Sequence, residues 1–216
     1  MKLYSVDLSP YATRVRMAIH AKGLDIEIAP PPGGDLKSAE YLAVNPMGKV
    51  PALVLDDGTV IPESDTIVEY LEDAFPQRPL RPATPEGKAR ARLIARVAEL
   101  YVMTQGLTLF GQMNPAARDQ AVVDEAFGKI DEALVHLNHV MGPGPYAVEG
   151  ALTTADCALA PLLFFMGVFG QAFAKGDVMA KYGKLGPYWA FIQTDPVIAE
   201  GIAEMAAALR ARMGGG

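Results

Sequence analysis

Cysteine is almost absent from this chain of 216 residues, in which Cys157 is the only one. A single cysteine excludes a disulfide within the chain and a cysteine-rich zinc site, and it is typical of a reducing compartment. The 25 acidic residues exceed the 19 basic ones, which gives a net charge of −6. This acidic balance argues against nucleic acid or an anionic membrane surface as a partner.

A long hydrophobic run is also missing. The longest nearly unbroken one, residues 158–170, is shorter than the ~20 residues that a membrane span needs and predicts a buried core helix. At the N-terminus, Lys2 is followed by "LYSVDL", which is too short for the apolar core of a signal peptide. We therefore expect a cytoplasmic protein with no membrane partner.

Strand and helix patterns alternate through the first 75 residues. The predicted order is βαβ–α–ββα, with a "DDG" hairpin turn, and its elements are strands at 2–6, 24–29, 51–55 and 59–61 and helices at 10–22, 36–44 and 64–75. On the first helix Val15, Ala18 and Ile19 share one face, while Arg14 and Lys22 are expected to point elsewhere.

A linker with four prolines in ten positions follows at residues 76–85, and everything after it has helical patterning. We therefore predict an α/β domain at 1–75 and an all-helical domain at 86–216. Apolar stripes are predicted on two of the helices, at Leu93, Val97, Leu100, Thr104 and Leu107 and at Val123, Phe127, Ile130, Leu134, Leu137 and Met141. The closing residues 214–216 are expected to be disordered.

Several features of the helical part have structural explanations. Thr153 and Asp156 have the spacing of a capping box at the start of a helix, and Pro161 predicts a kink within it. Cys157, in the same apolar helix, is expected to be inert core. His136 and His139 are three residues apart, but they lack a further ligand motif and favour a helix surface over a metal site.

Ser9-Pro10-Tyr11-Ala12 stands where a redox protein of thioredoxin-like order carries Cys-x-x-Cys. Dithiol chemistry is therefore excluded. Capping of the first helix by Ser9, with Pro10 at the first helical position, would by itself explain both residues.

Four stretches together resemble the glutathione S-transferase family: "SPYATRVR" from residue 9, "NPMGKVPAL" from 45, "PESDTIVEYL" from 62 and "LTTADCALAP" from 152. The resemblance spans nearly the whole chain. It implies a thioredoxin-like domain followed by an all-α domain, glutathione as co-substrate, no metal, a detoxifying transferase activity and a homodimer.

The resemblance also implies a glutathione site on the first domain. Val50, before a Val50–Pro51 bond that is cis in the family, would pair its backbone with the cysteinyl part of glutathione. Glu63 and Ser64 would hold the γ-glutamyl end, with Ser64 expected at the N-cap of the third helix. Lys49 and Lys37 are candidates for the glycyl carboxylate. Without the resemblance, the simpler explanation is preferred, in which Pro51 starts an edge strand, Ser64 caps a helix, and Glu63, Lys37 and Lys49 are solvated charges.

Ser9 acquires a chemical role in the same way. The nucleophile would be the glutathione thiol, and the Ser9 hydroxyl at the positive end of a helix would stabilise its thiolate. Tyr4 and Tyr11 are rivals, because some members of the family use a tyrosine, but neither matches the activating position as well.

A second-substrate pocket is expected between the two domains. Its candidate residues for a hydrophobic electrophile are Tyr11, Tyr101, Gln105, Phe110 and Met113, each of which also fits core packing. Two alternatives to a transferase stay open. One is a glutathione-dependent isomerase, dehalogenase or ether-cleaving enzyme, and the other is a non-catalytic binding or assembly module.

Overall fold

The structure, a computed structural model, describes residues 1–214. Its internal contacts divide the chain into two compact units, Met1–Leu80 with the segment that begins at Pro196, and Arg81–Asp195. The boundaries at 75 and 86 stay predictions, and the contacts add that the last helix groups with the first unit. Of the closing glycines, Gly214 ends that helix, and residues 215–216 lie outside the described part.

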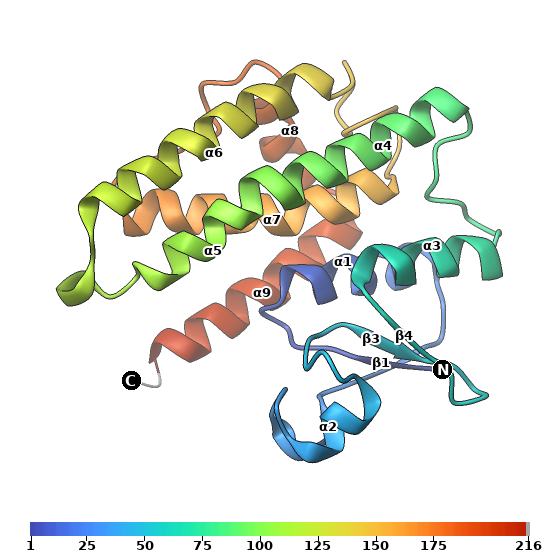
Figure 1. The fold of residues 1–216 in the computed structure, drawn as a ribbon. Helices are drawn as coiled ribbons and strands as arrows, with labels where there is room; N and C mark the ends of the chain where they lie inside the picture. The colour runs from blue at the N-terminus through green and yellow to red at the C-terminus, as the bar shows by residue number, and fades with distance from the viewer. Residues whose placement is uncertain (215–216) are drawn as a thin grey trace. The chain divides into compact units, whose positions relative to one another are not determined.

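The first unit contains a four-stranded mixed sheet in the order β2-β1-β3-β4. β1 pairs in parallel with β2, and β3 pairs antiparallel with both β1 and β4. Helices α1 and α3 lie on one side of this sheet and α2 on the other (Figure 1). The predicted βαβ–α–ββα order is confirmed, with the elements β1 Lys2–Tyr4, α1 Pro10–Lys22, β2 Glu27–Ala29, η1 Pro32–Gly34, α2 Ala39–Val44, β3 Ala52–Val54, β4 Val60–Pro62 and α3 Ser64–Ala74.

Helix α1 begins and ends where the sequence predicts, but two of its side chains differ from the prediction. Ser9 caps its start, and Gly23, at φ 64°, ends it in the left-handed conformation. Arg14 and Lys22 are buried, so the prediction that they point away from the core is wrong. Each has a polar partner in the interior, because Lys22 Nζ lies 2.7 Å from Glu72 Oε1 and Arg14 Nη1 lies 3.3 Å from Ser64 Oγ.

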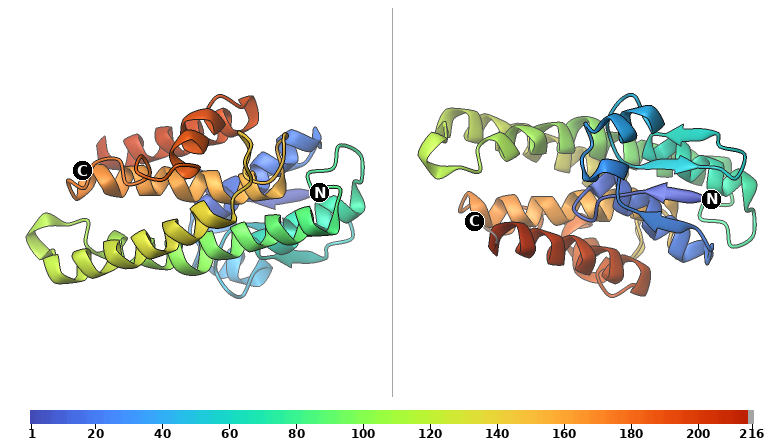
Figure 2. Two further views of the ribbon diagram at one scale, coloured as in Figure 1. Left: turned by 90° about the horizontal axis from the view of Figure 1, so that it is seen from above. Right: turned by 90° about the horizontal axis from the view of Figure 1, so that it is seen from below.

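The second unit is helical. Helices α4, η2 and α5 continue one another and run beside α6 (Figure 2). The elements are α4 Pro85–Val97, the π-helical η2 Ala98–Met103, α5 Thr104–Gly111, η3 Pro115–Ala117, α6 Gln120–Val140, α7 Thr154–Ala172 and α8 Leu185–Ile192. The last helix of the chain, α9 Pro196–Gly214, packs on α1 in the first unit.

The two predicted apolar stripes have different outcomes. On α6 and at its end, Val123, Ile130, Leu134, Leu137 and Met141 are all buried. On α4–α5 the prediction is mostly wrong, because Leu93, Leu100 and Leu107 are 47, 48 and 59% exposed. The buried face there combines small residues that allow close helix packing with larger apolar ones. The small residues include Ala91, Ala95, Ala98 and Gly106, and the larger ones include Ile94, Val102, Met103 and Leu109.

Two helical stretches, Pro85–Gly111 and Thr154–Ala172, are long and apolar enough to cross a membrane by length and composition alone. In Thr154–Ala172, 72% of the most apolar window is buried inside the protein. This burial supports the prediction that residues 158–170 belong to a core helix.

Candidate functional site

Ser9 lies at the N-cap of α1 with an extended backbone, φ −81° and ψ 116°. Its Oγ accepts a long hydrogen bond of 3.3 Å from the Ala12 backbone N–H. Among residues 1–214, no group accepts the hydroxyl hydrogen of Ser9. The side chain is half-buried, so a ligand atom at the positive end of the helix dipole has a donor available.

Val50 presents an open stretch of backbone just before β3. The Val50–Pro51 bond is cis, as in the family that the sequence resembles. Neither the N–H nor the C=O of Val50 is hydrogen-bonded within the described part of the chain. The preceding turn is held firmly, because Lys49 O accepts bonds from Tyr41 Oη at 2.6 Å and Asn45 Nδ2 at 2.8 Å. A peptide-like ligand can therefore add to this edge as an extra strand would.

At the start of α3, a residue with a strained backbone precedes backbone N–H groups that have no partner within the helix. Glu63 is exposed, has φ 69° and ψ 117°, and occupies the N-cap, so the prediction of Ser64 at this position is wrong by one residue. The first bond inside the helix runs from Ile67 N to Glu63 O at 2.9 Å. The N–H groups before Ile67 have no partner within α3 and are available to bind an anion.

Arg14 was not found as a site residue from the sequence. It is buried behind Ser64, donating to Ser64 Oγ at 3.3 Å, and its Nη1 lies 3.8 Å from the Asp65 carboxylate. A serine oxygen that accepts from a guanidinium is left to donate its own hydrogen to a ligand. No local signal connects Arg14 with Ser64, which lies 50 residues later in the chain.

Lys37 and Lys49 are exposed and belong to neighbouring parts of the surface. The Lys37 ammonium group lies close to Gly48, because a Cβ atom added to Gly48 would be only 2.8 Å from Lys37 Nζ. Gly48 also has φ 57°, so glycine is favoured there for two reasons. Lys37 therefore lies near Gly48, two residues before Val50, and Lys49 directly precedes Val50 in the sequence.

Comparison with known proteins identifies the fold and its family. The family model for the N-terminal domain of glutathione S-transferases matches residues 3–79, and the model for the C-terminal domain matches residues 120–188. The chain belongs to the glutathione S-transferase family. The predicted thioredoxin-like domain with an all-helical partner is thereby confirmed.

Individual members of the family are similar over most of their length. A maleylacetoacetate isomerase from Pseudomonas aeruginosa is 31% identical over 178 residues, which are 80% of this chain and 84% of that protein. Glutathione S-transferase Z2 from Arabidopsis thaliana is 36% identical over 171 residues, 74% of each chain. A structure of maleylacetoacetate isomerase from Methylobacterium extorquens with bound malonate and glutathione has a TM-score of 0.77 at 27% identity and covers 93% of this chain and 95% of that one.

The residues predicted to contact a second substrate belong to both units. Tyr11, in the first, is half-buried on the opening turn of α1. In the second unit Tyr101 is 58% exposed, whereas Gln105 and Met113 are half-buried. Phe110 is 38% exposed and packs edge-on against Phe165 and Phe169. Phe110 is therefore part of an aromatic cluster as well as a surface side chain.

The capping box of this transferase-family chain is confirmed at the start of α7. Asp156 is fully buried, and its carboxylate accepts hydrogen bonds of 2.8 Å from Ala147 N, Thr153 N and Thr153 Oγ1. Burial raises the pKa of Asp156, and the bonds from Ala147 and Thr153 oppose this change. Cys157 is buried beside it, and Pro161 lies inside the helix.

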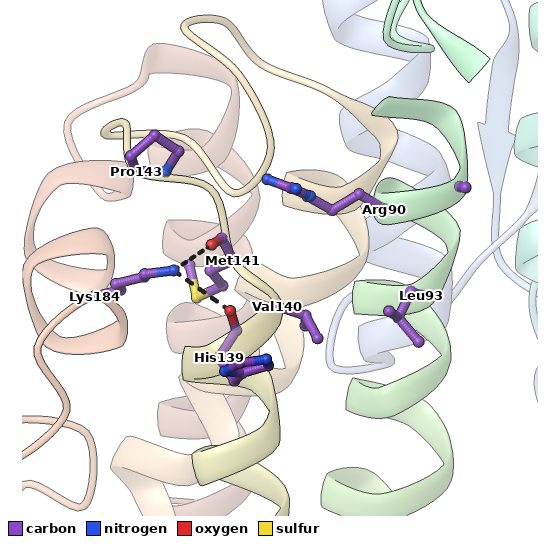
Figure 3. Close-up of a pocket in the computed structure, with 8 residues that line it drawn as sticks. Arg90, Leu93, His139, Val140, Met141, Pro143 and Lys184 are labelled. Atoms are coloured by element: carbon purple, nitrogen blue, oxygen red, sulfur yellow. Dashed lines mark hydrogen bonds between the residues drawn. The ribbon is translucent and has the colours of Figure 1, made fainter. Parts of the chain in front are cut away.

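A hollow of about 440 Å³ in the second unit is lined by residues of α4, the end of α6 and Lys184 (Figure 3). The Lys184 ammonium group donates to Met141 O at 2.7 Å and to His139 O at 3.4 Å, and Lys184 therefore caps the C-terminus of α6. Across residues 1–214, no three His, Cys, Asp or Glu side chains are grouped closely enough to hold a metal ion. His136 and His139 are therefore not part of any such group within this described range.

Proposed function

We propose that this protein is a glutathione transferase in which Ser9 stabilises the thiolate of bound glutathione. The observation that carries the proposal is the half-buried Ser9 hydroxyl at the start of α1, whose hydrogen has no acceptor in residues 1–214. Relatives of the chain are named as glutathione S-transferases or glutathione-containing isomerases, which supports glutathione as the co-substrate.

Each part of glutathione has a complementary group on the first unit. The backbone of Val50 pairs with the cysteinyl residue. The N–H groups that open α3, with Ser64 in front of Arg14, hold the γ-glutamyl carboxylate, and Glu63 pairs with the neighbouring ammonium. Lys37 and Lys49 neutralise the glycyl carboxylate at the other end of the tripeptide.

The magnitude of the proposed effect is sufficient for catalysis. A free thiol has a pKa near 8.5, so only a few per cent is ionised at neutral pH. A hydrogen bond to a charged group contributes about 1.5–3 kcal/mol, which corresponds to a decrease of about one to two pKa units. The thiol loses its proton to solvent, and the thiolate then forms the C–S bond with an electrophilic carbon of the second substrate. The bond from that carbon to a leaving group breaks and the group departs with the electron pair, or, where the carbon belongs to an activated double bond, the neighbouring atom takes up a proton from solvent.

The second unit favours an uncharged electrophile. Residues 97–117 contain the candidates Tyr101, Gln105, Phe110 and Met113 but no lysine or arginine. They offer aromatic, thioether and amide groups, which suit an apolar or aromatic compound. A dianionic substrate would need a cation that this segment does not supply.

A glutathione-dependent isomerase is the second candidate, because relatives at 31–35% identity include maleylacetoacetate isomerases. In that reaction the thiolate adds to a conjugated double bond and leaves after rotation. Both candidates use Ser9 in the same way, and they differ only in the compound that is attacked.

The test compares wild type with Ser9→Ala in three assays. We expect both proteins to bind immobilised glutathione, and we expect the variant to lose about 10- to 100-fold of turnover with a generic aromatic electrophile. Equal turnover of the two proteins would remove Ser9 from its role. Activity of the wild type toward maleylacetoacetate, with none toward the aromatic electrophile, would favour the isomerase. Binding without either activity would favour a non-catalytic module.

A cytoplasmic homodimer is the assembly we propose for this enzyme. Leu93, Leu100 and Leu107 recur every seven residues along α4–α5, and all three are about half-exposed in the single chain. Burial of such a stripe by a second copy removes apolar surface from water. Light scattering at micromolar concentration should give twice the monomer mass for wild type and the monomer mass for Leu100→Glu.

A further inference from the structure

Arg16 holds the loop that connects β1 to Ser9. It lies on α1, and its side chain is 3% exposed. Its Nη1 donates to Ser5 Oγ at 2.5 Å, and its Nη2 donates to the Asp7 carbonyl at 3.2 Å. A longer contact of 3.5 Å joins Nη1 to the Val6 carbonyl. Because the donors of a guanidinium have a fixed planar arrangement, these bonds fix the path of three consecutive loop residues.

Thr13 extends this network to Ser9 itself. Thr13 is fully buried, and its Oγ1 accepts from Arg16 Nη2 at 2.9 Å and donates to the Ser9 carbonyl at 3.0 Å. The same carbonyl accepts from Thr13 N at 2.9 Å. Two hydrogen bonds from one residue therefore orient the peptide group of Ser9, and one of the two depends on Arg16.

The remaining donor of Arg16 reaches the C-terminal helix. Arg16 Nε donates to Glu204 Oε2 at 2.9 Å across 188 residues of sequence. The helices α1 and α9 lie side by side in the first unit (Figure 1). Gly201 permits this approach, because a Cβ there would lie 2.6 Å from Met17 Cε. Asp7, the other nearby carboxylate, is 4.0 Å from the guanidinium and 68% exposed, so Glu204 is the main counter-charge.

We propose that Arg16 and Glu204 are positioning residues for Ser9, so that α9 determines how strongly the active-site hydroxyl stabilises a bound thiolate. The inference rests on the proposed function of Ser9. Loss of Glu204 leaves a buried guanidinium without its counter-charge, which favours its movement toward solvent or toward Asp7. Either movement releases Thr13 and the loop, and a displacement of about 1 Å at a reacting group is enough to lower a rate up to about 10²-fold.

The test uses Glu204→Ala with Glu200→Ala as its matched control. Glu200 lies one turn earlier on α9, and its carboxylate pairs with exposed His20 at 3.1 Å. It therefore belongs to the same helix pair without contacting the loop. The readouts are the thiol pKa of bound glutathione, followed by thiolate absorbance in the ultraviolet, the glutathione dissociation constant and kcat.

For Glu204→Ala we expect the bound thiol pKa to rise by about one unit and kcat to fall about tenfold. Glutathione affinity should change less than about threefold, since the binding groups are untouched. Glu200→Ala should match wild type in all three readouts. Thr13→Val interrupts the network without altering α9, and it should shift the pKa in the same direction even if Glu204→Ala does not fold.

A wild-type thiol pKa in both Glu204→Ala and Thr13→Val would overturn the inference. An equal shift in Glu200→Ala would also overturn it, because the effect would then come from helix docking in general. Ser9→Ala separates the two proposals. If Ser9→Ala does not raise the thiol pKa, the proposed function fails and the inference with it. If Ser9→Ala raises the pKa while the other variants do not, only the inference fails.

Discussion

Helices α1 and α7 both begin at a hydroxyl residue, but the two hydroxyls have opposite surroundings. At α7 the Thr153 hydroxyl donates to Asp156, and the buried carboxylate is saturated by three donors. At α1 the Ser9 oxygen accepts one long bond, and its hydrogen has no acceptor in residues 1–214. A cap whose groups satisfy one another stabilises the fold, whereas a cap with an unused donor is able to bind a ligand.

The sharpest test of the closed cap is Asp156→Ala. It leaves the buried N–H groups of Ala147 and Thr153 without an acceptor, so we expect a loss of at least about 3 kcal/mol in the free energy of unfolding. Urea denaturation measures this loss. The control is Asp119→Ala at the exposed N-cap of α6, where about 1 kcal/mol is expected. Equal losses would show that burial of the α7 cap adds nothing.

The open cap is tested by Ser9→Cys treated with glutathione disulfide. A thiol at a helix N-terminus ionises more readily than a free one, so it should attack one sulfur of the disulfide and release one glutathione thiolate. We expect one glutathione per chain by intact mass, together with loss of transferase turnover. Wild type is the control, because its only thiol, Cys157, is buried. An unmodified variant would mean that no glutathione reaches position 9.

The outline of both caps is local in sequence and was predictable. Ser9 with Pro10, and Thr153 with Asp156, are separated by at most three residues, so spacing alone identifies them. The βαβ–α–ββα order follows in the same way from apolar periodicity and turn residues. The resemblance to a known family was needed to give Ser9 a ligand, because a cap by itself has a structural explanation.

The errors arose where the outcome depends on distant residues. Arg14 and Lys22 were expected to point away from the apolar face of α1, but both are buried, because Ser64 and Glu72 supply partners about 50 residues away. The leucines of α4–α5 were expected to face the core, yet small residues such as Ala98 and Gly106 allow closer packing on the other side. Neither pairing nor interhelical distance is encoded in a local pattern.

A third helix start sharpens the comparison, because α3 has no side-chain cap and begins after the strained Glu63. Glu63→Gly and Glu63→Ala both remove the carboxylate, so each should weaken glutathione binding about tenfold in calorimetry. Only glycine adopts the positive φ without strain. We therefore expect the free energy of unfolding of Glu63→Gly to be about 1 kcal/mol higher than that of Glu63→Ala. Equal stabilities would indicate that this backbone conformation is not strained.

The smallest expected effect concerns a carboxylate that caps nothing. Asp131 on α6 has its pKa lowered by the Lys181 ammonium and then by the Tyr182 hydroxyl, in contrast to buried Asp156. Because the unfolded chain binds a proton at Asp131 more tightly, its contribution to stability is present above the unfolded pKa of about 3.9 and is lost as the pH falls through the folded value. Asp131→Asn should therefore flatten the acid decline of the melting temperature between about pH 5 and pH 3. The matched control is Glu132→Gln. Glu132 is the neighbouring exposed carboxylate, and it forms no ion pair with any other residue in 1–214. The melting temperature of this variant should therefore decline with acid as that of wild type does. Identical pH profiles for Asp131→Asn and wild type would assign the acid decline to other carboxylates.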